Sequence, residues 1–156
     1  MGTVTYPDTN VANEINDEFV ALQINLLDKH PDFKEASGAG RVIFAPTFLF
    51  TDAKGREIRR YLGWLPPESF LGELEFVRGM HAFNSGQFLP ARDHFAAVLD
   101  KHGDADVAAE SLYWQGIAGF LGGNRDGEAL AEAWNGVRER FPDSTWATRA
   151  APIEDA

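Results

Sequence analysis

The spacing of apolar residues changes at Pro66 and Pro67, and this change divides the chain into two parts. In the first part, runs of bulky residues alternate with short helical patterns, as is typical of a compact α/β unit. The spacing predicts a helix over about 11–17, a strand over 19–26 that is buried on at least one face, a short helix around 33–36, and strands over 47–51 and 57–62. Because only a few residues separate the last two strands, we expect them to form an antiparallel hairpin.

After Pro66 the pattern is helical throughout. Phe70, Leu74 and Val77 share one face of the first helix, and Pro67 suits a first helical turn, where its missing N–H is not needed. The expected helices cover about 67–84, 89–102, 105–121, 127–140 and 145–150. Brief, glycine-marked loops between them indicate antiparallel neighbours. We therefore expect two segments, an α/β segment over 1–65 and an all-α segment over 66–156.

The helical part repeats itself. Residues 75–83 align with 112–120, which places Gly79 37 positions before Gly116. A repeat of about 34–40 residues with two helices in each unit is typical of a helical-hairpin solenoid. The first unit resembles a tetratricopeptide repeat, because Gly79, Ala91 and Phe95 follow its small–small–aromatic spacing. The resemblance implies that the two helices of each pair approach closely.

Aromatic residues are frequent in this helical part, and they include Tyr113, Trp114 and Trp134. Two interpretations remain open for these three side chains. They lock helix against helix, as aromatics do in paired-helix repeats, or some of them line a concave face that binds a protein or peptide partner.

Around the predicted hairpin, Phe44-Ala45-Pro46-Thr47 opens an apolar strand, an Asp-x-x-Gly turn ends at Gly55, and the second strand stops at Gly63. With the sequence before it, this order resembles the second half of a thioredoxin-fold domain, over about residues 3–78. The resemblance implies a cis-proline at Pro46. It also implies that Ala45, Pro46 and Thr47 line a substrate groove.

The sequence resembles only the second half of the thioredoxin fold. In that fold a first strand, a helix, a central strand and a Cys-x-x-Cys motif would all precede residue 1. Without the central strand, the predicted strands over 19–26 and 47–51 would both expose open edges, and unpaired backbone groups are costly. The favoured expectation is a gene that extends upstream. The alternatives are that the two strands pair directly, or that open edges of two chains pair as a homo-oligomer.

Composition excludes several classes of function. The 156 residues contain no cysteine, so this polypeptide has no disulfide, no thiolate zinc site and no thiol redox chemistry. A net charge of -10 argues against a nucleic-acid partner. No apolar run is long enough for a membrane span, and no signal peptide pattern begins the chain. The expected compartment is cytoplasmic as written, and extracytoplasmic if an upstream signal peptide exists.

No catalytic residues, metal or cofactor are expected. The four histidines lack ligand spacing, although a metal site joining His81 and His94 with Asp93 or Glu110 is an alternative. Gly38-Ala39-Gly40 does not match a nucleotide fingerprint. Glu128, Glu132 and Glu139 form an acidic helix face, which we interpret as solvated surface.

Two hypotheses about function follow. In the first, the chain is a thioredoxin-like protein that is redox-inactive as supplied and is the C-terminal portion of a thiol–disulfide oxidoreductase. In the second, it is a non-enzymatic interaction module that combines a thioredoxin-like platform with helical repeats.

Overall fold

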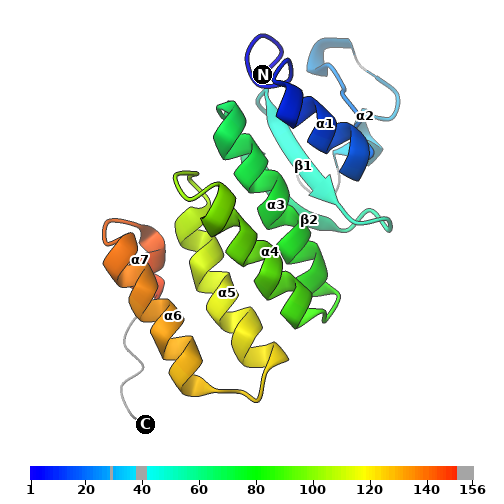
Figure 1. The fold of residues 1–156 in the computed structure, drawn as a ribbon. Coiled ribbons are helices and arrows are strands. Elements are labelled where there is room, and N and C mark those ends of the chain that lie inside the picture. The colour runs from blue at the N-terminus through cyan, green and yellow to red at the C-terminus, as the bar shows by residue number, and fades with distance from the viewer. Residues whose placement is uncertain (29, 38–41, 151–156) are drawn as a thin grey trace. The chain divides into compact units, whose positions relative to one another are not determined.

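The computed structural model describes residues 1–28, 30–37 and 42–150 (Figure 1). The chain forms two compact units, residues 1–70 and 71–156, and the division falls inside helix α3 (Pro67–Asn84). The hydrophobic pattern predicts a boundary between residues 65 and 66, which lies just before the start of α3 and not inside it. The fold class is mixed, since a small antiparallel sheet accompanies a chain that is mostly helical.

Helix α1 (Thr9–Glu18) opens the first unit, close to the predicted 11–17. Asp8 caps it, because one carboxylate oxygen accepts the backbone N–H groups of Asn10 at 3.0 Å and Val11 at 3.2 Å. Val11 is completely buried. The cap therefore fixes where the helix begins, and this apolar side chain anchors its inner face.

The strand predicted over 19–26 is wrong. Residues 19–25 form no strand, and a short 3₁₀ turn, η1 (Leu26–Asp28), follows them. Val20 is fully exposed and Leu22 is 70% exposed. A strand needs a neighbour to complete its backbone ladder, and in the described part of the chain the sheet contains only β1 and β2. The direct pairing of 19–26 with 47–51 is therefore absent as well.

The predicted short helix and hairpin are present. Helix α2 (Phe33–Ala36) precedes β1 (Thr47–Thr51) and β2 (Glu57–Leu62), which pair antiparallel. Asp52 holds the turn, since its Oδ1 accepts the backbone N–H groups of Lys54 at 2.8 Å and Arg56 at 2.9 Å. Gly55 has φ of 74°, a conformation that a glycine adopts readily. The Gly38-Ala39-Gly40 stretch lies outside the described residues.

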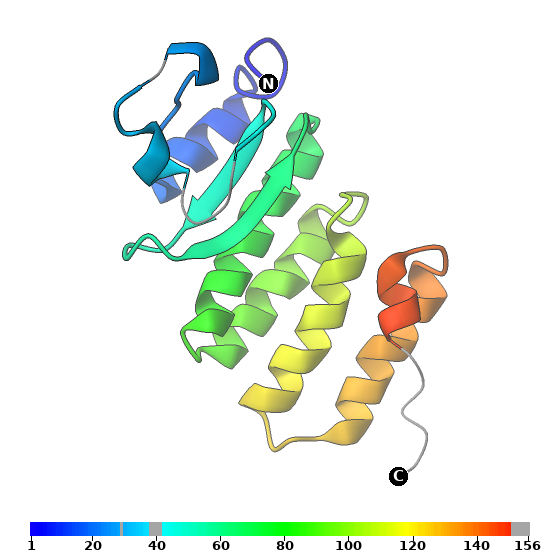
Figure 2. The same cartoon turned by 180° about the vertical axis from the view of Figure 1, so that it is seen from behind.

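In residues 71–150 the second unit contains helices joined by short loops, as the periodicity predicts. After α3 come α4 (Phe88–Lys101), α5 (Ala108–Gly122), α6 (Gly127–Arg140) and the short α7 (Thr145–Arg149). Helix α5 packs against both α4 and α6, and the three run antiparallel side by side (Figure 2).

Glycines let the paired helices approach closely. A Cβ added at Gly79 on α3 would lie 2.5 Å from the ring of Phe95 on α4. A Cβ added at Gly116 on α5 would lie 2.8 Å from the Cβ of Ala133 and 3.5 Å from the ring of Trp134, both on α6. Both helix pairs thus place a glycine against an aromatic side chain of the next helix, and the two glycines, Gly79 and Gly116, are equivalent in the sequence alignment.

Candidate functional site

The end of the hairpin at Pro46 is the part of the first unit that the sequence singles out. The Ala45–Pro46 peptide bond is cis, the isomer that the resemblance implies. The carbonyl oxygen of Pro46 accepts the backbone N–H of Gly63 at 2.9 Å, and Thr47 Oγ1 donates to the carbonyl oxygen of Phe44 at 2.6 Å. These bonds hold the segment before β1 beside the end of β2.

Four large apolar side chains are exposed on the two chain segments that meet here. Ile43 is 74% exposed, Phe44 61%, Leu62 60% and Trp64 52%. Leu62 is the cross-strand partner of Thr47. We call Ile43, Phe44, Leu62 and Trp64 the proline-end patch. Single exposed apolar residues are ordinary on a protein surface, but several around one structural feature mark a candidate binding surface.

Aromatic side chains of the hairpin pack together on one face of the sheet, next to the Pro46 end of β1. Phe48 stacks on its cross-strand partner Tyr61 with ring centroids 4.6 Å apart, and it also packs against Phe70 at 5.3 Å. Tyr6 meets Phe70 edge to face at 6.2 Å. Burial raises the pKa of Tyr6, so its phenol stays neutral at ordinary pH.

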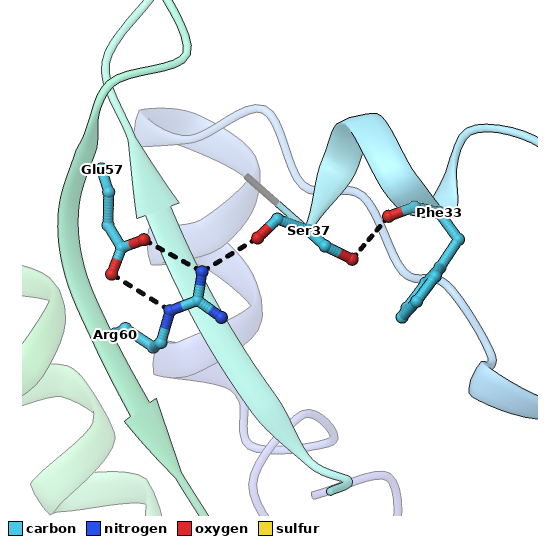
Figure 3. A network of polar contacts seen from close by, with 4 residues as sticks. All are labelled: Phe33, Ser37, Glu57 and Arg60. Atoms are coloured by element: carbon cyan, nitrogen blue, oxygen red, sulfur yellow. Dashed lines mark hydrogen bonds and ion pairs between the residues drawn. The ribbon is translucent and has the colours of Figure 1, made fainter. Parts of the chain in front are cut away.

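Arg60 occupies the opposite face of the sheet and joins β2 to the end of α2 (Figure 3). Its Nε and Nη2 donate to the two carboxylate oxygens of Glu57 at 3.1 and 2.9 Å, and Nη2 also donates to the carbonyl oxygen of Ser37 at 2.9 Å. Ser37 Oγ donates to the carbonyl oxygen of Phe33 at 2.5 Å. The hydrogen bond from Arg60 lowers the pKa of Glu57. These contacts position the chain and leave the Glu57 carboxylate in an ion pair.

The aromatic residues proposed for partner binding lie between helices. Tyr113 stacks on Trp134 with centroids 5.0 Å apart and planes 5° apart, and it meets Trp146 of α7 at 5.1 Å. Trp114 packs edge to face against Phe83 at 5.2 Å. All of these side chains are half-buried. Their contacts join α5 to α3, α6 and α7, as the packing interpretation expects, while their partial exposure is equally compatible with the partner-binding interpretation.

A buried carboxylate, which sequence reasoning missed, connects α3 to α4. Glu75 is 9% exposed, its Oε1 lies 2.9 Å from His94 Nδ1, and Arg78 donates to its Oε2. Burial, the largest single influence, raises the pKa of Glu75. The hydrogen bonds and positive charges of His94 and Arg78 together outweigh burial and lower the pKa to about 2.

A sequence signal for this group existed. In the sequence alignment of 75–83 with 112–120, Glu75 occupies the same position as Leu112, which is a buried residue of the second helix pair. A glutamate at a position where the other helix pair has a buried leucine indicates a buried charge that needs partners.

Metal-binding and acidic features give no further site. No three His, Asp or Glu side chains gather as a metal site in residues 1–28, 30–37 and 42–150. His94, part of the alternative metal site, bonds Glu75 instead. Glu128, Glu132 and Glu139 lie on α6 with Asn135 and Gly136 around an open, shallow hollow.

Comparison with known proteins identifies no relative. No protein-family model matches the chain, and neither the curated proteins nor the solved structures contain a significant match to it.

In the part of the chain that the structure describes, no helix is both long enough and apolar enough to cross a membrane.

Proposed function

We propose that this polypeptide is a redox-inactive, thioredoxin-like protein that binds extended apolar segments of other proteins at the proline-end patch. The observation that carries the proposal is the exposure of Ile43, Phe44, Leu62 and Trp64 around the cis-proline. Covering these side chains removes apolar surface from water, which favours association.

The backbone at this end suits recognition of an extended chain. The Pro46 carbonyl already accepts the N–H of Gly63, and proline has no N–H to donate. Polar recognition of a bound segment therefore falls to Ala45 and Thr47. The lack of cysteine removes any nucleophilic thiol from this polypeptide, so its role is binding without bond exchange.

The experiment measures binding of a fluorescein-labelled, uncharged peptide of alternating valine and threonine by fluorescence anisotropy. The double variant Phe44→Ser with Leu62→Ser should bind at least about tenfold more weakly, because burying one large apolar side chain contributes about 1.5–3 kcal/mol and 1.4 kcal/mol is tenfold in affinity. Val20→Ser is the matched control, since Val20 is apolar and fully exposed but outside the patch. Equal affinity for the double variant and the native chain would refute the proposal.

A second candidate is that the same surface serves a thiol–disulfide oxidoreductase whose thiols lie on another stretch of polypeptide. The order of cis-proline, hairpin, Gly63 and helix favours it. A polypeptide extended with upstream coding sequence should then reduce insulin, whereas the present 156 residues should not. If no in-frame Cys-x-x-Cys is encoded within a few dozen codons upstream, this candidate fails and the binding proposal stands.

For the helical unit we propose a tetratricopeptide-like scaffold that presents the first unit or a partner protein. The shared contact of Gly79 with Phe95 and of Gly116 with Trp134 supports it. Tyr113 and Trp134 stack on each other and stay half-buried, so their accessible parts remain the candidate partner-binding surface of this unit.

A further inference from the structure

The sequence of strand β1 contains none of the residues that usually discourage pairing at a sheet edge. The strand forms a ladder with β2 on one side only, among the residues that the structure describes. Its sequence, Thr-Phe-Leu-Phe-Thr, contains no charge, no proline and no glycine. Edges of this kind are templates for another strand, and proteins commonly protect them with charges, prolines or bulges.

Strand β2 carries those protections. Its residues include Glu57, Arg59 and Arg60. The register shift between Phe50 and Thr51 leaves Ile58 as the extra residue of a bulge on β2. Charge and irregularity therefore disfavour pairing at the edge of β2, and the two edges of this small sheet differ in their capacity to add a strand.

The sequence of β1 is also a palindrome centred on Leu49. If two copies of β1 pair antiparallel about a two-fold axis through Leu49, then Leu49 faces Leu49, Phe48 faces Phe50, and Thr47 faces Thr51. Aromatic pairs and threonine pairs directly opposite each other stabilise antiparallel sheets, and no like charges meet in this register. The contact is self-complementary, as a two-fold interface requires.

The palindromic register also matches the two faces of the sheet. Phe48 and Phe50 lie on one face, where Phe48 packs on Tyr61 and Phe70 and Phe50 packs on Phe19 at 6.1 Å. In this register the aromatic faces of the two copies become continuous. A slip by one residue would place the aromatic face of one copy beside the other face of its neighbour.

We propose that a second copy of this chain pairs with β1, antiparallel and centred on Leu49, to form a four-stranded sheet in the order β2–β1–β1–β2. The proposal does not rest on the exposed apolar side chains of the proline-end patch, because it uses the backbone edge of β1, although Thr47 belongs to both surfaces. The competing occupants are the chain's own 19–25 segment, which would leave a monomer, and a strand from a different protein.

Light scattering coupled to size-exclusion chromatography, from micromolar to submillimolar protein, tests the proposal. The native chain should approach twice the monomer mass as concentration rises. Leu49→Lys should be monomeric, because two lysines would then face each other at the two-fold axis. Leu49→Glu should be monomeric for the same reason, and an equimolar mixture of the two variants should recover the dimer because Lys then faces Glu. Leu62→Lys is the control of equal charge on β2, and it should still dimerise.

A single-cysteine variant keeps the test decisive if the charged variants fail to fold. The chain has no native cysteine, so Leu49→Cys under a mild thiol oxidant should give a disulfide-linked dimer on a non-reducing gel, and Leu62→Cys should not. A native chain that stays monomeric throughout, a dimer that survives Leu49→Lys, or equal cross-linking of both cysteine variants would overturn the proposal.

Discussion

Glu75 illustrates how one charged side chain is accommodated in a helical core. An ionised carboxylate loses hydration when it is buried, and this loss is repaid only by well-placed partners. His94 and Arg78 supply them from α4 and from the next turn of α3. The cluster thus makes the α3–α4 contact depend on pH in a way that an apolar contact would not.

The sign of this dependence follows from the pKa of Glu75. It falls from 4.5 to about 2 in the folded chain, so the ionised carboxylate stabilises the fold above pH 4.5, and that stabilisation is lost as pH falls toward 2. We expect Glu75→Gln to lower the free energy of unfolding at pH 7 by roughly 2–3 kcal/mol. The difference between variant and native chain should shrink steadily below pH 4.5, in urea unfolding curves recorded at a series of pH values.

Glu132→Gln is the matched control for this prediction. Glu132 is exposed on α6, so its replacement should change the free energy of unfolding little at any pH. If Glu75→Gln and Glu132→Gln gave the same pH profile, the ion-paired carboxylate would not contribute to stability.

Between α3 and α4, the close contact of Gly79 with the ring of Phe95 determines how the pair packs. Phe95 is completely buried and fills the space that a side chain at Gly79 would need. Interiors are packed closely enough that even one methyl group is felt. A substitution at position 79 should therefore change stability more by its contact with α4 than by its effect on the helix propensity of α3.

Gly79→Ala tests this account, because two effects oppose each other. Alanine favours a helix over glycine by about 1 kcal/mol, but a methyl group 2.5 Å from the Phe95 ring overpacks the contact. Overpacking typically costs about 1–3 kcal/mol. We expect the clash to dominate and the free energy of unfolding to fall by about 1–2 kcal/mol in urea denaturation.

Gly127→Ala provides the comparison, since a Cβ at Gly127 meets nothing within 4 Å. That change should be neutral or slightly stabilising. Stabilisation by Gly79→Ala equal to that by Gly127→Ala would mean that the α3–α4 contact is looser than the 2.5 Å approach indicates.

Along the entire chain, local signals predicted those elements whose partners are close in sequence. The helices from Pro67 to Arg149 follow from apolar spacing and short loops, and the hairpin follows from its turn residues. The prediction of a strand over 19–26 is wrong because a strand needs a paired neighbour that the local sequence does not specify. Bulky residues such as Val20 and Leu22 indicate strand propensity without supplying that neighbour. These residues are of the types that favour strands, but they form no strand in the structure.

The candidate site divides in the same way. Pro46 and its neighbours were found because a proline before an apolar strand is visible in the sequence. The exposure of Phe44, Leu62 and Trp64 was not, since apolar residues are expected to be buried and nothing local says which ones lack a cover. Finding the Glu75 cluster requires comparison of one helix pair with the other in the sequence alignment.

Hydrogen–deuterium exchange measured by mass spectrometry tests whether residues 19–25 lack regular structure while the helices are well protected, over all the described residues. Among them, the backbone N–H groups of residues 20–24 donate no hydrogen bond to another described backbone group, so we expect them to exchange nearly as fast as in an unstructured peptide. Amides of α4 and α5 around Phe95 and Ala118, which are completely buried, should exchange slowest because they require extensive unfolding. Peptides from α1, capped by Asp8 and anchored by Val11, serve as the internal comparison at intermediate protection.

Strong protection of residues 20–24 in dilute protein would mean that this segment pairs as a strand after all. Protection that appeared there only at high concentration would instead indicate that it pairs with another copy.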